Sequence, residues 1–296
     1  MFDLISTILL LLIPIDALIR LIKKDEKKVK KYFSYFFLVL GINLTLKLIF
    51  RIERNYIDPF AFPSTHSSLS IIPFFVYDNL KYKILFLIYA IVIGSFRIFA
   101  EVHDLYQVLF GYLFSLVSII IFNKLEEKLE NFIHRKAIHI GLGSLIGYLL
   151  FLYPLLGILF MILLLLIGII LYLLKDFFFI KLFLQNYSKD STGYEAFTFV
   201  LGTFSASLIS YALNINPYFI PIYLAWVDGL SSTFGKLFNS GDKKSIYGLF
   251  GGFIGGIISV LATRTNPIIA IVVSISEYFI RKIDDNLILP IITFLM

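Results

Sequence analysis

Apolar runs separated by short polar breaks fill this chain from end to end, and they constrain its fold more than any other feature. A helix needs about 20 residues to cross the roughly 30 Å hydrocarbon core of a membrane, and backbone polar groups in lipid must be paired within the segment. Runs near that length occur at residues 4–22, 33–50, 66–80, 84–100, 106–122, 138–153, 155–174, 195–213, 217–234, 246–262 and 266–280, with a short apolar end at 287–296. The sequence therefore predicts an all-α integral membrane protein with about 11 or 12 transmembrane helices in two helical-bundle domains.

The composition excludes several other classes of protein. The chain is 59% hydrophobic and 16% charged, with a mean hydropathy of +0.89, which soluble domains do not match. It has no cysteine, so disulfides, thiolate nucleophiles and cysteine-bound metals are excluded. The first run contains Asp16 and has no basic start or small-residue cleavage site, so we interpret it as a retained span.

Basic residues predict the orientation, because cytoplasmic loops are enriched in lysine and arginine. Alternating the runs places 21 of the 26 basic residues on one side, in the loops at 20–31, 81–83, 123–139, 175–194, 235–245 and 281–282. We therefore expect a multi-pass protein of the cell membrane with its amino terminus outside. The formal charge of +6 is then a topology signal, and no nucleic-acid partner is expected.

Cations and histidines gather on the predicted outer side of the first half. Guanidinium groups bind phosphate oxygens in a bidentate fork, and lysine adds a point charge. Ser64, Thr65 and the backbone amides of the following helix would add an anion site. The alternative is that the cations are interfacial anchors. The residues on this side are Lys47 and Arg54, spaced to share a helix face, His66, Arg97, and His103 with Gln107 one helical turn later.

These residues resemble the type-2 phosphatidic acid phosphatase superfamily over about residues 33–122. The matching motifs are Lys47-x6-Arg54-Asn55, Pro63-Ser64-Thr65-His66 and Arg97-x5-His103-x3-Gln107. The resemblance implies that His103 attacks phosphorus to form a phosphohistidine and that His66 protonates the leaving oxygen. It also implies that Lys47, Arg54 and Arg97 hold the phosphoryl oxygens without a metal or other cofactor.

Three positions depart from that family's pattern. Asn55 replaces a proline, Thr65 replaces a glycine, and Gln107 replaces the aspartate that orients the nucleophilic histidine. An amide oxygen orients an imidazole ring but brings no charge to stabilise its cation. Two outcomes stay open: a slow phosphatase, or a site that only binds phosphate.

Polar residues on the predicted cytoplasmic side mark the second half. We expect a phosphatase-like domain at 1–123, a charged linker at 124–136 and a second membrane domain at 137–296. Carboxylates and lysines at one surface suit a magnesium–nucleotide site. Gly229-x5-Gly235-Lys236-Leu237 is not a Walker A loop, since its spacing is one residue too long and no Ser or Thr follows the lysine.

This half resembles the CTP-dependent polyprenol kinase family, which includes dolichol and phytol kinases. The matching signatures are Arg135-Lys136-x-x-His139, Asp228-Gly229 with Gly235, Lys244-Ser245-x-x-Gly248, and Glu277 followed by Asp285-Asn286-x-x-x-Pro290; Tyr247 stands where glutamate is usual. The resemblance implies Mg²⁺ with CTP as the phosphate donor. It assigns metal or base roles to Asp228, Glu277 and Asp285, and nucleotide binding to Lys244 and Ser245. Lys236, in the same predicted loop, is a further candidate for nucleotide binding.

Together the two halves predict a bifunctional isoprenoid-lipid enzyme. The outer half would dephosphorylate a polyprenyl phosphate or diphosphate, and the inner half would rephosphorylate the polyprenol from CTP, recycling a dolichol-type carrier. One alternative keeps only the kinase, with an inactive phosphatase half. The other is a lipid-phosphate transporter that is not an enzyme.

Overall fold

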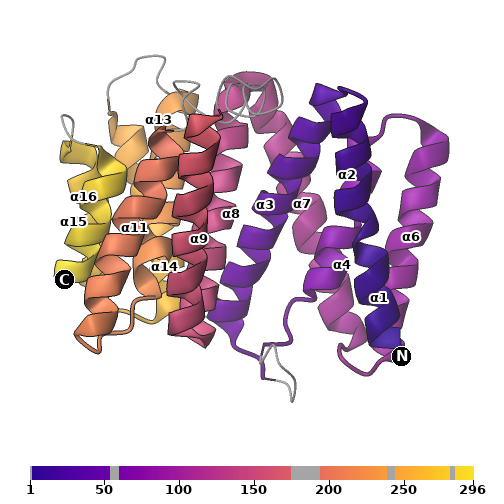
Figure 1. Cartoon of the computed structure of the whole chain (residues 1–296), viewed down its shortest axis with the longest axis horizontal. Coiled ribbons are helices and arrows are strands. Elements are labelled where there is room, and N and C mark those ends of the chain that lie inside the picture. The colour runs from indigo at the N-terminus through magenta and orange to yellow at the C-terminus, as the bar shows by residue number, and fades with distance from the viewer. Residues whose placement is uncertain (1, 54–59, 175–193, 239–243, 281–283) are drawn as a thin grey trace. The chain divides into compact units, whose positions relative to one another are not determined.

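A computed structural model describes residues 2–53, 60–174, 194–238, 244–280 and 284–296 (Figure 1). In this part of the chain the regular structure is helical, apart from one isolated β-bridge between Glu53 and Phe60. The chain divides into two compact units, Met1–Glu127 and Lys128–Met296.

In the first unit, two of the predicted apolar runs are each divided into two helices near a proline. Its helices are α1 (Phe2–Leu10), α2 (Leu12–Ile22), α3 (Glu26–Phe50), α4 (Thr65–Ser70), α5 (Ile72–Val76), α6 (Leu80–Phe99) and α7 (Leu105–Leu129). The first apolar run is interrupted at Leu11 because Pro14 has no N–H to bond the carbonyl four residues earlier. Pro73 has the same effect on the run at 66–80, which is two short helices where one was predicted.

Close helix contacts hold this unit together around α3 and α7. The Tyr35 hydroxyl of α3 donates to Asn123 Oδ1 of α7 at 2.6 Å. At Gly111 of α7, an added Cβ would lie 2.8 Å from the Ser64 carbonyl oxygen, too close for any other residue. This glycine therefore brings α7 directly against the start of α4.

The second unit is built around one buried, irregular helical segment. Its helices are α8 (Asn131–Leu152), α9 (Pro154–Leu173), α11 (Tyr194–Ala212), α12 (Phe219–Tyr223), the π-helix η1 (Leu224–Asp228), α13 (Gly229–Phe238), α14 (Ile246–Thr263), α15 (Pro267–Phe279) and α16 (Asp285–Leu295). Tyr223, Leu224 and Val227 are fully buried in the core. Glycines of α14 allow it to pack against this segment, since a Cβ at Gly255 would lie 2.2 Å from the Trp226 carbonyl oxygen.

Seven helices of the described part, counting α1 with α2, are long and apolar enough to cross a membrane. They are Phe2–Ile22, α3, α6, α7, α8, α9 and α14, and shorter apolar helices cover Thr65–Val76, α15 and α16. Large apolar side chains are exposed along them, for example Leu155, Leu159 and Leu166 of α9. The chain is therefore an all-α, multi-pass integral membrane protein, as the sequence predicted.

Candidate functional sites

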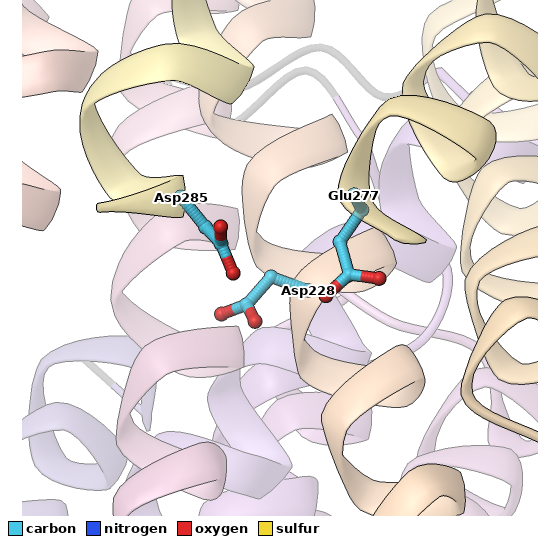
Figure 2. A group of neighbouring side chains, drawn as sticks. All are labelled: Asp228, Glu277 and Asp285. Atoms are coloured by element: carbon cyan, nitrogen blue, oxygen red, sulfur yellow. The ribbon is translucent and has the colours of Figure 1, made fainter. Parts of the chain in front are cut away.

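Three carboxylates from three separate helices meet in the second unit (Figure 2). Asp228 ends η1, Glu277 lies in the last turn of α15, and Asp285 begins α16. One oxygen from each lies within 4.8 Å of the other two. Because Mg²⁺ binds oxygens at about 2.0–2.1 Å in octahedral geometry, its ligands lie about 2.9 Å apart when adjacent and about 4.2 Å apart when opposite, so the three oxygens would move closer together to hold one ion.

Two lysines and a histidine contact these carboxylates. Lys244 Nζ lies 3.0 Å from Glu277 Oε1 and 2.9 Å from Asp285 Oδ2. Lys136 Nζ and His139 Nε2 lie 2.9 and 3.1 Å from the same oxygen, Asp228 Oδ2. The group thus pairs three acidic side chains with cations inside a largely buried space, where unpaired charges are costly.

The surroundings shift the titration of the two members that lie outside the long apolar helices. Burial raises the pKa of Asp285 to about 6, although Lys244 beside it acts in the opposite direction. Burial also acts to lower the pKa of Lys244, but the Glu277 and Asp285 carboxylates outweigh it, and the pKa is raised. Lys244 is therefore held as a cation between two acidic groups.

Asp228 belongs to a π-helix, η1. A π-turn is wider than an α-turn, rare, and concentrated at functional sites. Here the five residues of η1 are buried, and Asp228 is the last of them. The segment then returns to a regular helix, α13, whose Ser231 donates to Glu277 Oε2 at 2.6 Å. Ser231 was not predicted; its spacing of three residues from Asp228, which places both on one helix face, was the available signal.

The other residues predicted for this half make helix-capping, cation–ring, ion-pair and hydrogen-bond contacts. Ser245 caps α14 by accepting from Gly248 N at 3.2 Å, a helix-capping role. Lys236 Nζ lies 4.6 Å from the ring centroid of Phe132. Arg135 pairs with Glu195 at 3.0 Å, and Asn286 donates to the Glu195 carbonyl at 3.4 Å.

In the first unit, His103 precedes α7 by two residues, and its side chain contacts Gln107 in the first turn of that helix. The Gln107 amide oxygen lies 2.8 Å from His103 Nδ1 and also accepts from Asp104 N at 3.3 Å. Gln107 therefore orients the imidazole from the position where the resemblance expects an aspartate.

The predicted phosphate-binding cations are engaged by groups of the chain itself. Lys47 is fully buried and donates to the Phe60 carbonyl. Arg97 donates to the Asp3 carboxylate and, at 3.3 Å, to Ser6 Oγ. The shared helix face predicted for Lys47 and residue 54 was wrong, because α3 ends at Phe50 and the next residue has φ = 48°, outside the helical region. Arg54 itself, like Asn55, lies outside the described residues.

Residues around the start of α4 form hydrogen bonds with α3, α7 and α1. Ser64 caps α4 through Ser67 N and Oγ, while its own N–H donates to the Gln107 carbonyl at 3.1 Å. Thr65 Oγ1 donates to Asn43 Oδ1 at 2.8 Å. His66 Nε2 lies 3.2 Å from Thr7 Oγ1 of α1. Asp3, Thr7 and Asn43 were not predicted; each is a polar residue within or beside an apolar run, which is the only signal the sequence offers.

In comparisons with known proteins, no family model, curated protein or solved structure matches this chain. Its function is inferred from the two groups of side chains described above.

Proposed function

We propose that the second unit is a metal-dependent lipid-alcohol kinase that transfers the terminal phosphate of CTP to a polyprenol of the dolichol type. The observation that carries this proposal is the meeting of Asp228, Glu277 and Asp285 within 4.8 Å, flanked by Lys244 and Lys136. Three hard oxygen donors with adjacent cations are the combination that phosphoryl transfer from a nucleotide needs.

In this proposal the three carboxylates hold Mg²⁺, which supplies charge neutralisation for the nucleotide phosphates. The chain's own contribution is positioning. Lys244 lies between two carboxylates, so it is placed to bind a phosphate oxygen when those carboxylates turn to the ion. Lys136 and His139 hold Asp228 Oδ2 from the other side and fix its direction.

The reaction would join the lipid hydroxyl oxygen to the terminal phosphorus and break the bond to the leaving CDP. The hydroxyl proton would pass to one of the three carboxylates; which one accepts it stays open. The choice of CTP and of a polyprenol rests on the family resemblance of the second half, and the cytoplasmic placement rests on the basic loops.

A second activity is proposed for the first unit, because a specific geometry favours it. His103 Nδ1 is held at 2.8 Å by Gln107, and we propose Nε2 as the ring atom that attacks phosphorus. Arg97 is adjacent in the fold, since its carbonyl accepts from His103 N at 3.3 Å. We propose a slow, outward-facing polyprenyl phosphate or diphosphate phosphatase in the cell membrane, which with the kinase would recycle a carrier lipid.

The test of the kinase is transfer of label from terminally labelled CTP to polyprenol by the purified protein, with ATP and UTP run beside it. Mg²⁺-dependent labelling that is abolished by Asp228→Asn and reduced by Lys244→Ala is expected. His103→Ala is the matched control and should leave the labelling unchanged.

Two other outcomes would change the assignment. Label entering diacylglycerol in place of polyprenol would keep the kinase and remove the dolichol cycle. If no nucleotide labels any lipid alcohol, yet the protein moves lipid phosphate across a vesicle bilayer, the transporter is correct.

A further inference from the structure

Helix α1 reaches two of the residues proposed for the phosphatase. Its Asp3 carboxylate accepts from Arg97 Nη1, and its Ser6 hydroxyl lies 3.3 Å from the same nitrogen. Its Thr7 hydroxyl lies 3.2 Å from His66 Nε2. Three polar residues of one short helix thus contact the arginine and the histidine that the resemblance places around a phosphate.

The other contacts of α1 with α6 include ring contacts and one hydrogen bond, in which the Tyr89 hydroxyl donates to the Leu9 carbonyl at 2.9 Å. The Phe2 ring stacks on Phe96 of α6 with the ring centroids 5.6 Å apart, and it is tilted against Phe99 with the centroids 6.0 Å apart. The helix ends at Leu10, where Pro14 interrupts the backbone bonding between α1 and α2. Proline is a common cause of helix kinks, so the junction between α1 and α2 is a point at which the Phe2–Ile22 segment can bend.

The two side chains of the ion pair between Asp3 and Arg97 differ in their exposure to solvent. The Arg97 side chain is 4% exposed, whereas that of Asp3 is 52% exposed. A guanidinium group binds a carboxylate and a phosphate through the same N–H donors. The arginine therefore belongs to the interior of the unit, and the carboxylate is the exchangeable partner.

We propose that Asp3 is an internal anion in the place of the substrate's phosphate, and that α1 is a cover which the phosphate group displaces. This inference rests on the proposed phosphatase and identifies where its substrate binds. While Asp3 remains, its negative charge offsets that of Arg97 and repels a second anion. A phosphate monoester or diphosphate carries more negative charge than a carboxylate, so it can displace Asp3 from Arg97.

The first test is binding of inorganic phosphate to the full-length protein in detergent, measured by titration calorimetry. Asp3→Asn removes the competing charge, and we expect phosphate to bind roughly 1.5- to fivefold more tightly, the range for a partly exposed ion pair. Asp25→Asn is the matched control, since it removes the ion pair between Asp25 and Lys28 (2.8 Å) and should not change phosphate affinity. Arg97→Gln should abolish the gain from Asp3→Asn.

The second test fixes α1 in place without altering Asp3. Because the chain has no cysteine, Phe2→Cys with Phe99→Cys can be joined by a reducible bifunctional thiol reagent. Cross-linking should weaken phosphate binding and lipid-phosphate hydrolysis at least tenfold, and reduction should restore both. Each single-cysteine variant treated with the same reagent serves as the control.

The outcomes separate this inference from the activity on which it rests. Weaker phosphate binding by Asp3→Asn would mean that Asp3 positions Arg97, and unchanged binding in the cross-linked protein would mean that α1 does not cover the site; either overturns the proposal. Tighter binding by Asp3→Asn without any hydrolysis would support the internal anion and refute the phosphatase. Hydrolysis that neither Asp3→Asn nor the cross-link changes would support the phosphatase and refute the internal anion.

Discussion

Replacing Lys136 by methionine tests the charge balance of the carboxylate group. Lys136 Nζ lies 2.9 Å from Asp228 Oδ2, and both side chains are less than one-tenth exposed. Removing one partner of a buried ion pair costs about 3–5 kcal/mol, because the other charge is left without its partner. His139 remains 3.1 Å from the same oxygen, so we expect a cost of about 3 kcal/mol.

The measurement is thermal unfolding of the purified protein with and without Mg²⁺. A loss of about 3 kcal/mol corresponds to a melting temperature lowered by roughly 6–12 °C for a unit of this size. If the carboxylates bind the ion, Mg²⁺ supplies the missing positive charge and stabilises Lys136→Met by about 2.7 kcal/mol at a hundredfold excess over its dissociation constant. The wild-type protein should gain less, because its lysine already pairs with Asp228.

Two variants control this experiment. Lys236→Met removes a lysine of the same unit that lies over the Phe132 ring, and its response to Mg²⁺ should equal that of the wild type. Lys136→Met combined with Asp228→Asn removes both charges and should recover stability while reducing the response to the ion. A response of Lys136→Met to Mg²⁺ no larger than that of the wild type would refute the assignment of Asp228 as a metal ligand.

Three further predictions concern packing, chemistry and topology. Gly255→Ala should destabilise the protein by about 1–3 kcal/mol in thermal unfolding because its Cβ would meet a backbone oxygen at 2.2 Å, whereas Gly252→Ala on the same helix, with no atom nearer than 3.5 Å, should be tolerated. Gln107→Asp should raise the rate of phosphate release from a polyprenyl diphosphate by supplying the charge that the amide lacks; an unchanged or lower rate would favour the kinase-only alternative. Cysteine introduced at Asn214 should react with an impermeant maleimide on intact cells and cysteine at Lys81 should not, and labelling of both from one side would contradict the predicted orientation.

The local sequence pattern was enough to predict the fold class and part of the candidate site in the first unit. The apolar runs predicted a multi-pass helical protein because a membrane demands long segments with internally satisfied backbones, and the helices follow those runs closely. The contact between His103 and Gln107 was predictable from their spacing of four residues, although His103 lies two residues before the start of α7. Pro14 and Pro73 were visible as well, although their effect on the two runs was not predicted.

Only the tertiary structure determines which charged side chains form ion pairs with one another. Asp228 and Lys136 are 92 residues apart, and Arg97 and Asp3 are 94 apart, so no spacing rule joins them. The sequence grouped Lys236 with Lys244 because both lie near one predicted loop, but only Lys244 contacts Glu277 and Asp285, whereas Lys236 lies over an aromatic ring. Helix periodicity fixes which residues share a face. Pairing between faces depends on how distant helices pack and on glycines that admit close approach.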